Sequence, residues 1–290
     1  MDNRMRRNLL MLAGCVPLVV LFCFLFADRW RRKRAGERPP QQDKLLRPAG
    51  HSLSLQIADL GDSLLTWMLG AYLAALAAVG LFSLTDSESF TGSVVSLAVS
   101  GVSAAVCIVM AWRTEQKIRT ARLGLLGEQA VAEQLQGLWA KGCRVFHDVP
   151  GGGKWNLDHV VVGPSGVFAI ETKARTKRPG RRGERDYEAV FDGKAIRFPN
   201  YTDTNAIPQA ERNARWLAGM LSKATGEPVG VTGLVALPGW FVTLKTKAEI
   251  KVLNAKQIPH FIAGEPRKLS DKVMQQIAYQ LEQRCRDVEF

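Results

Sequence analysis

The sequence has few cysteines and histidines, the residue types that build disulfide frameworks and zinc sites. Its 290 residues include five cysteines and four histidines. Cys15, Cys23 and Cys107 lie inside apolar runs, Cys143 and Cys285 are far apart, and no C-x-x-C pair occurs. This pattern argues against a secreted disulfide scaffold and against a structural zinc site. It favours a soluble part that is reduced and cytoplasmic.

Acidic residues are outnumbered by basic ones. The chain has 27 Asp and Glu against 39 Lys and Arg, which gives a formal net charge of +12. A basic chain suits two kinds of partner, nucleic acid and an anionic membrane surface. The charge by itself does not choose between them, and membrane topology accounts for part of it.

Charge is absent from three long stretches near the N-terminus. They span about 9–27, 64–84 and 93–112, and each has the length of roughly 20 residues that a helix needs to cross a bilayer. The second and third are rich in Gly, Ala and Ser, which lets helices approach closely. We therefore expect residues 1–112 to be a membrane region with three transmembrane helices. The alternative is buried core helices, which are seldom uncharged over such a length.

The basic residues between these runs predict the orientation. The segment 28–63 is rich in Lys and Arg, and its part 35–56 is rich in Pro and Gln, so we expect a largely irregular loop. The positive-inside rule places this loop, and everything after Trp112, in the cytoplasm. Arg4, Arg6 and Arg7 weigh against this orientation, but the opposite one would export a more basic loop. The expected location is the inner (cytoplasmic) membrane, multi-pass, with the lipid bilayer as a partner.

From 113 to 290 the pattern becomes that of a cytoplasmic α/β domain. Helical periodicity runs through 124–142, 207–226 and 269–285. Short apolar segments predict strands at 143–151, 157–163, 167–175, 229–239 and 248–254, and a hairpin with an Asp-Gly turn at 187–198. The expected fold is a mixed sheet flanked by helices.

Two acids and a lysine interrupt the apolar strands of NLDHVVVGPSGVFAIETKAR. If Gly163 lies opposite Gly166, the numbers of opposed residues sum to 329, and Asp158 faces Glu171 across the ladder. Lys173 comes two residues after Glu171 and so shares its face of the sheet. Opposed carboxylates are unfavourable unless a cation lies between them, and their oxygens suit Mg²⁺ or Mn²⁺. Lys173 could then stabilise an attacking hydroxide or a developing phosphoryl charge.

The shared face depends on the turn between the two strands. Pro164 cannot take the positive φ that tight two-residue hairpins need. A four-residue loop, 163–166, built on a type I turn allows the proline and keeps the sum at 329. A three-residue loop would shift the sum to 330 and separate the acids onto opposite faces, unless a bulge reversed that shift.

Three stretches together resemble the nuclease-related domain (NERD), a family of the PD-(D/E)XK, restriction-endonuclease-like superfamily. They are GLLGEQAVAEQLQ, NLDHVVVGPSGVFAIETKAR and NAIPQAERNARWLAGML, within about 120–265. The D-x12-E-x-K signature falls on Asp158, Glu171 and Lys173. The resemblance implies a restriction-endonuclease-like sheet and places Glu128 and Gln209 beside the metal site. Glu128, Asp158 and Glu171 would then hold Mg²⁺ (or Mn²⁺).

Each of these residues also has a plainer interpretation. Glu128 could be a solvated helix charge and Asp158 the cap of a turn. Glu171 and Lys173 could form an ion pair on an exposed edge, and Gln209 could be an ordinary residue of a first helical turn.

A basic connection follows the candidate site. It contains Arg175, Lys177, Arg178, Arg181 and Arg182, which we expect to contact a phosphate backbone, although a solvated loop would have the same composition. The expected function is a membrane-anchored, metal-dependent nuclease that hydrolyses phosphodiester bonds in DNA. The alternative is a non-catalytic nucleic-acid-binding or scaffolding membrane protein with a nuclease-like fold.

Overall fold

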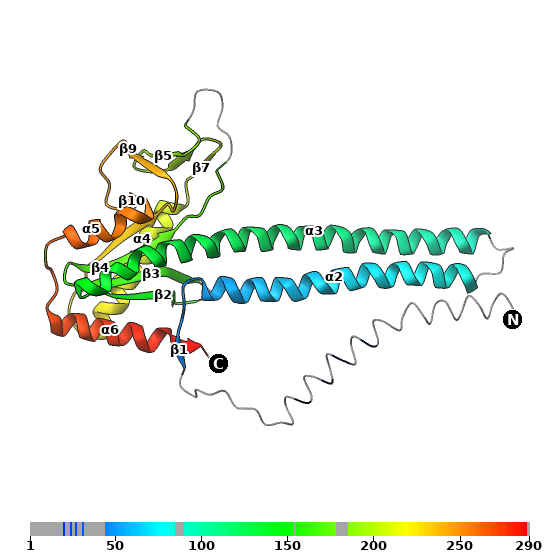
Figure 1. Cartoon of the computed structure of the whole chain (residues 1–290), viewed down its shortest axis with the longest axis horizontal. Coiled ribbons are helices and arrows are strands. Elements are labelled where there is room, and N and C mark those ends of the chain that lie inside the picture. Colours follow the sequence, from blue (N-terminus) through cyan, green and yellow to red (C-terminus); the bar gives the residue numbers. More distant parts are fainter. Residues whose placement is uncertain are drawn as a thin grey trace. The chain divides into compact units, whose positions relative to one another are not determined.

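The computed structural model describes residues 44–84, 90–153, 155–177 and 185–288, with four isolated positions, Val20, Phe24, Ala27 and Arg31 (Figure 1). The described residues form two compact units. One contains residues 57–119, and the other contains residues 44–56 and 120–288.

The first unit is made of two long helices, which continue beyond it. Helix α2 spans His51–Leu84 and helix α3 spans Phe90–Leu135. Each has an apolar stretch long enough to cross a membrane, by length and composition alone. A Cβ added to Gly70 of α2 would lie 3.1 Å from the Sγ of Cys107 on α3. Small residues therefore let the two helices approach closely, as the composition predicts.

Two of the three predicted membrane runs lie in these helices. Run 64–84 ends α2, and run 93–112 lies within α3. Run 9–27 falls outside the described residues except at Val20, Phe24 and Ala27. Among the described residues there are thus two candidate spans, and the third stays a prediction.

Two sequence predictions about these helices are wrong in detail. Helix α2 begins at His51, so the end of the stretch 35–56, predicted to be irregular, is helical. The third apolar run and the next predicted helix, 124–142, are joined into the single helix α3. The joining segment 113–123 contains no Pro or Gly, and its Arg, Gln, Glu, Lys and Ala are good helix formers.

The second unit is built on a five-stranded mixed sheet. Its strand order is β10-β8-β4-β3-β2, with β2, β3 and β4 antiparallel and β4, β8 and β10 parallel (Figure 1). The strands are β2 Arg144–Pro150, β3 Asn156–Gly163, β4 Gly166–Thr172, β8 Val231–Ala236 and β10 Lys251–Leu253. The predicted mixed α/β fold is confirmed.

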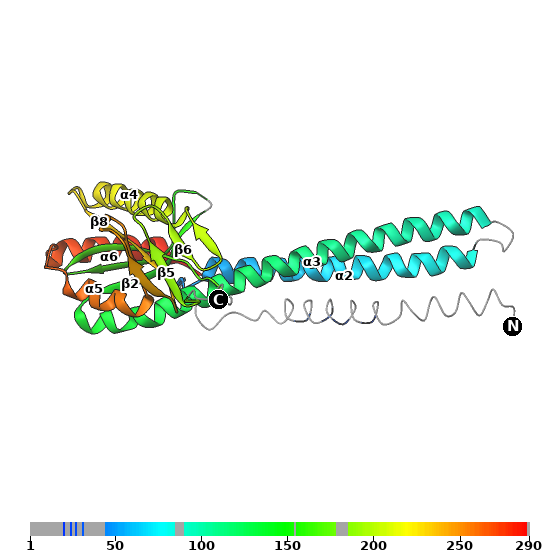
Figure 2. The same cartoon turned by 90° about the horizontal axis from the view of Figure 1, so that it is seen from above.

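Helices cover both faces of this sheet (Figure 2). Helices α4, Ala206–Thr225, and α6, Asp271–Cys285, pack on one face with Leu217 and Leu281 in the core. The C-terminal part of α3, the 3-10 helices η1 and η2, and α5, Ile258–Gly264, cover the other face. The 3-10 helices are η1 Gln136–Lys141 and η2 Ala255–Gln257. Helix α4 ends at Thr225, and Gly226 caps it with a left-handed φ of 76°, as glycine commonly does after a helix.

A smaller four-stranded sheet lies beside the N-terminal part of α4. Its order is β7-β6-β5-β9, and its strands are β5 Glu188–Phe191, β6 Ile196–Phe198, β7 Tyr201–Asp203 and β9 Phe241–Leu244. The predicted hairpin is confirmed: Phe191 pairs with Ile196, and Gly193 takes a φ of 99° in the turn. Strands β7 and β9 escaped prediction because they are too short to show an alternating pattern.

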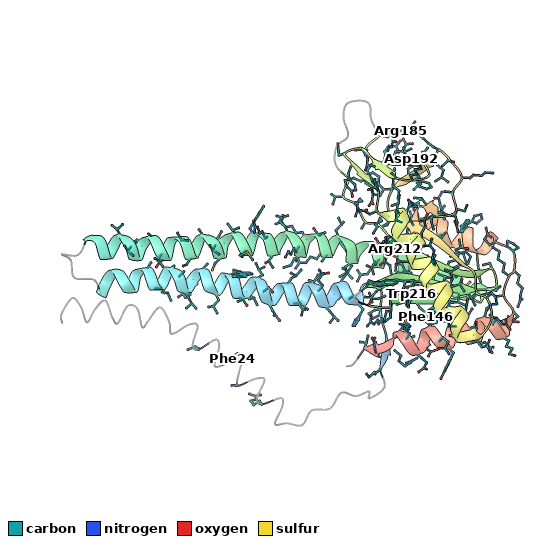
Figure 3. All side chains as sticks on the ribbon, turned by 180° about the vertical axis from the view of Figure 1, so that it is seen from behind. Phe24, Phe146, Arg185, Asp192, Arg212 and Trp216 are labelled. Atoms are coloured by element: carbon teal, nitrogen blue, oxygen red, sulfur yellow. The ribbon has the colours of Figure 1, made fainter. Side chains whose placement is uncertain are left out.

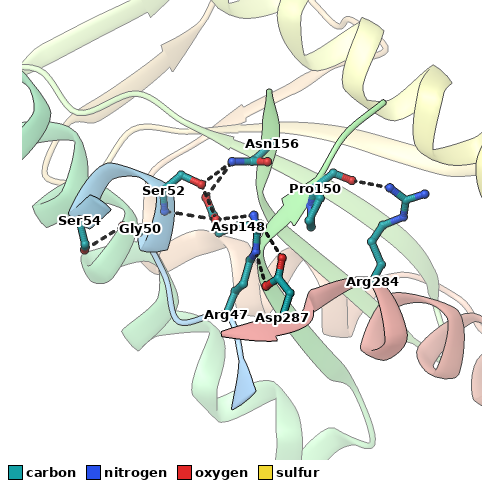
Figure 4. A network of polar contacts seen from close by, with 9 residues as sticks. All are labelled: Arg47, Gly50, Ser52, Ser54, Asp148, Pro150, Asn156, Arg284 and Asp287. Carbon is teal, nitrogen blue, oxygen red and sulfur yellow. Dashed lines mark hydrogen bonds and ion pairs between the residues drawn. The ribbon is translucent and has the colours of Figure 1, made fainter. Parts of the chain in front are cut away.

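The segment before α2 and the first residues of α2 belong to the second unit. We call residues 44–56 the N-terminal strap. Its strand β1, Leu45–Leu46, pairs antiparallel with β11, Arg286–Val288. Arg47 of the strap donates hydrogen bonds to Asp148 and Asp287 (Figure 4). Part of the stretch predicted to be irregular is therefore bound to the rest of the second unit.

Candidate active site

The hairpin between β3 and β4 has the even register that the candidate site requires. Gly163 lies opposite Gly166, and the pairing continues to His159 opposite Ile170, so the predicted sum of 329 is confirmed. Neither residue of the turn itself has a positive φ, and Gly166 takes a φ of 133°. The unusual dihedral thus falls on a glycine, which leaves the proline in the turn unstrained.

Asp158 and Glu171 lie one position beyond the last pair of this ladder. The Oδ2 of Asp158 accepts a hydrogen bond of 2.6 Å from the backbone N–H of Thr172. On the other side of β3, the pairing with β2 is interrupted between His147 and Val149. At this interruption Asp148 has a φ of 49°, a left-handed conformation that is uncommon outside glycine. Asp148 and Asp158 therefore lie where the regular pairing of β3 with its neighbours is broken.

Helix α4 holds the end of β4. The Nζ of Lys173 donates to the Oε1 of Glu171 at 2.8 Å and to the Oε1 of Gln209 at 2.9 Å. The Nδ2 of Asn213 donates to the Oε2 of Glu171 at 2.9 Å. Gln209 thus lies at the site, in agreement with the resemblance. Sequence reasoning missed Asn213, although it follows Gln209 by one helical turn and so shares its face.

Glu128 approaches the site from α3. Its neighbour Gly127 lets the helix come close to the end of β4, since an added Cβ would lie 2.5 Å from the Cβ of Ala174. The Glu128 side chain is buried, and its Oε2 has no hydrogen-bond partner in the described part of the chain. The backbone N–H of Gly50, in the N-terminal strap, acts on this carboxylate and lowers its pKa.

The buried acids act on one another electrostatically. Burial raises the pKa of Glu128 to about 7, and the charges of Asp148 and Glu171 raise it as well. Burial, Glu171 and Glu128 hold the pKa of Asp158 well above its usual value. Burial also raises the pKa of Glu171, and the ammonium of Lys173 opposes that effect. A further cation among these carboxylates would relieve the cost of burying their charges.

The acids fit a divalent cation in kind, but they do not converge as a set of three. Carboxylate oxygens are the donors that Mg²⁺ takes, and the partnerless Oε2 of Glu128 is buried among them. Within the described ranges, no three Asp, Glu, His or Cys side chains lie close enough together to hold a metal ion. The ammonium of Lys173 instead takes one oxygen of Glu171. The three-ligand site therefore stays a prediction.

A network of polar contacts connects the N-terminal strap to β2 and β3 (Figure 4). Asp148 is buried, and its Oδ2 accepts hydrogen bonds from the Nη1 of Arg47 at 3.0 Å and from the Oγ of Ser52 at 2.7 Å. Asn156 of β3 donates to the same network. Sequence reasoning missed Asp148, which is an acid inside an apolar strand and so carries the same local signal as Asp158.

The predicted phosphate-binding residues are only partly described. Arg178, Arg181 and Arg182 fall outside the described residues. Arg175 forms an ion pair of 2.6 Å with the buried Asp203, and the ammonium of Lys177 lies over an aromatic ring.

Sequence reasoning also missed an arginine on α4. Arg212 is exposed, and its charge lowers the pKa of Glu171 (Figure 3). Trp216 follows one turn later, with its ring in an edge contact with Trp155.

Comparison with known proteins supports the nuclease-related assignment. Residues 123–238 match the family model of the nuclease-related domain, NERD. This range contains all five predicted site residues, but it leaves out the N-terminal strap and α6. No curated protein and no solved structure gives a significant match.

Proposed function

We propose that the second unit is a metal-dependent nuclease that hydrolyses phosphodiester bonds in DNA. The observation that carries the proposal is the contact of Lys173 with Glu171 and Gln209. The buried Glu128 and the half-buried Asp158 are the two further acids whose charges act on this site. The match to the nuclease-related domain supports a nuclease-related function for the residues that hold this arrangement.

The proposed roles follow from the contacts. Asp158 and Glu171, with Glu128, would hold Mg²⁺ or Mn²⁺, which would stabilise charge on the phosphate and lower the pKa of a bound water. Asn213 fixes one oxygen of Glu171, so the other oxygen is directed toward Lys173. The ammonium of Lys173 has three N–H donors, and Glu171 and Gln209 accept two of them. The third could donate to a water or a phosphate oxygen.

We further propose that residues 1–112 anchor the enzyme in the inner (cytoplasmic) membrane. In α2 and α3 almost none of the apolar stretches is buried within the structure. Large side chains such as Leu65 and Val102 are exposed there, and exposed apolar surface of this extent is unfavourable in water. A bilayer would cover it, and the basic flanks favour a cytoplasmic location for the nuclease unit.

Lys173→Ala in the full chain tests the catalytic proposal. With Mg²⁺ or Mn²⁺ in detergent, we expect the wild type to cut DNA and the variant to lose roughly a hundredfold or more in kcat, since it removes a charge from the reacting groups. Lys268→Ala is the matched control, because Lys268 forms an ion pair of similar length, 2.9 Å, with Glu265 away from the site. Cleavage that survives both Lys173→Ala and Glu171→Ala would contradict the mechanism.

A second candidate function is a non-catalytic nucleic-acid-binding or scaffolding module. It is favoured by the lack of three converging ligands among the described residues and by the ion pair that occupies Glu171. Such a module would bind nucleic acid in a salt-dependent way without metal. Binding would be unchanged in Asp158→Asn and Glu171→Gln, and no cleavage would accompany it.

A further inference from the structure

A cavity of about 610 Å³ opens beside Lys173 in the second unit. One wall is the chain that leaves β4, including Lys173 and Arg175. The other wall is aromatic and carries Phe198, Tyr201 and Trp240. Cavities of this size are typical of sites that enclose a small ligand or one part of a larger one.

The first wall is cationic. Lys173, Arg175 and Lys177 follow one another at every second position of the chain after β4. Trp240 and Asp203 hold Arg175 in place: its carbonyl accepts a hydrogen bond from the indole N–H of Trp240, and its guanidinium is paired with Asp203. The ammonium of Lys177 lies 5.7 Å from the centre of the Trp240 ring. Lys173 and Arg175 line the cavity, each paired with a carboxylate. The ammonium of Lys177 lies next to the lining residue Trp240, and it is the basic group that we expect to contact a phosphate.

The second wall presents one exposed ring on a buried support. Tyr201 is 50% exposed, whereas Phe198 is 9% and Trp240 is 2% exposed. Phe198 is parallel to Tyr201 at 6.3 Å and meets Trp240 edge-on at 4.8 Å. The guanidinium of Arg175 lies over Tyr201, 5.5 Å from the ring centre. Exposed aromatic rings and guanidinium planes are both surfaces on which unpaired bases stack.

This combination distinguishes between two forms of nucleic acid. In a duplex, the base faces are covered by their neighbours, and a protein reaches only the backbone and the base edges. A single strand exposes its base faces, so only an unpaired nucleotide can use both walls of the cavity.

We propose that the cavity binds unpaired nucleotides, with a base stacked on Tyr201 and Arg175 and with phosphates near Lys177. The substrate class would then be single-stranded DNA, or a strand that leaves a duplex. The inference rests on the proposed function, because the cavity is lined by Lys173, the residue proposed to act in cleavage. Binding itself requires no hydrolysis.

Binding of oligonucleotides to the full chain in detergent tests this proposal. A fluorescent single-stranded oligodeoxynucleotide and its duplex are titrated in EDTA, so that cleavage does not interfere. We expect tighter binding of the single strand. Tyr201→Ala should weaken that binding roughly tenfold or more, as loss of one stacked base does elsewhere, while Tyr201→Phe keeps the ring and the affinity. Duplex binding should be the same in all three proteins.

Tyr279→Ala provides the matched control. Tyr279 is on α6, outside this cavity, and is 59% exposed. Its removal should leave single-strand affinity unchanged. Thermal unfolding of Tyr201→Ala and Tyr201→Phe shows whether any loss of affinity comes from loss of the fold.

Two results would overturn the inference. One is equal affinity for single strand and duplex in the wild type, and the other is a folded Tyr201→Ala with unchanged single-strand affinity. The proposed function fails separately: a protein that binds single strands through Tyr201 but cuts no DNA with metal keeps this inference and loses the nuclease. A protein that cuts duplex DNA without using Tyr201 does the reverse.

Discussion

At the residue scale, the environment of Glu128 links the candidate chemistry to pH. Its carboxyl is buried, one of its oxygens lacks a partner among the described residues, and its pKa is raised from the model-compound value of 4.5 to about 7. Between these two values the folded state keeps a proton that the unfolded state has lost. The free energy of unfolding therefore falls as the pH rises through this window.

Glu128→Gln removes this dependence, because the amide keeps the shape of the protonated acid without the charge. At pH 8 we expect the variant to have a free energy of unfolding larger than that of the wild type by on the order of 3 kcal/mol, and therefore a higher Tm. At pH 5 the two proteins should have a similar Tm. Differential scanning calorimetry at both pH values is the measurement. Glu133→Gln, at an exposed position of the same helix, should show no such difference between the two pH values.

The same experiment detects metal binding without activity. If Glu128 takes part in holding Mg²⁺, adding the ion at pH 8 should raise the Tm of the wild type, since binding to the folded state stabilises it. The rise should be smaller in Glu128→Gln. An equal rise in both proteins would show that Glu128 is not a ligand.

At the element scale, the approach of α3 to β4 depends on a glycine. A methyl group at Gly127 would lie 2.5 Å from the Cβ of Ala174, too close for either backbone to stay in place. We expect Gly127→Ala to lower the free energy of unfolding by about 1–3 kcal/mol through overpacking, and to reduce cleavage by moving Glu128. Chemical denaturation measures the first effect.

Gly219 provides the matched helix position. It lies in α4, and an added Cβ would have no neighbour within 4 Å. Gly219→Ala should therefore raise the free energy of unfolding by roughly 0.5–1 kcal/mol, because alanine has the better helix propensity. If both substitutions stabilise the protein, the close approach of α3 to β4 is not required.

At the scale of the whole molecule, the second unit extends beyond the range that matches the nuclease-related domain. The N-terminal strap contains β1 and the start of α2, and β1 pairs with β11 at the other end of the chain. Arg47 bridges Asp148 and Asp287, and the backbone N–H of Gly50 in the strap lowers the pKa of Glu128. The residues that lead into the first described apolar helix therefore take part in positioning a candidate site residue.

Arg47→Ala tests this arrangement. The Arg47 and Asp148 side chains are 16% and 6% exposed, so the change leaves an uncompensated acid in a buried place. We expect a loss of about 2–4 kcal/mol in the free energy of unfolding of the second unit. Arg267→Ala removes an exposed ion pair with Asp271 and should cost less than about 1 kcal/mol. Equal losses would show that the strap is not a structural part of the unit.

The sequence by itself determined the local geometry of this protein. The D-x12-E-x-K spacing and most of the helices and strands follow from periodicity and turn chemistry, which depend on neighbouring residues. The even register at Gly163 and Gly166 was one of the two registers that the turn allowed, and the structure decided between them. For the same reason, the position of Asn213 one turn after Gln209 was available from the sequence.

The tertiary structure decided what depends on distant residues. The burial of Glu128, the docking of the N-terminal strap on Asp148 and the cavity beside Lys173 each join segments far apart in the chain. No local pattern encodes such contacts, because they arise only when packing brings α3, the strap and the smaller sheet around the end of β4. The sequence thus specified the residues for the candidate chemistry, and packing set their charge environment and the shape of the cavity beside them.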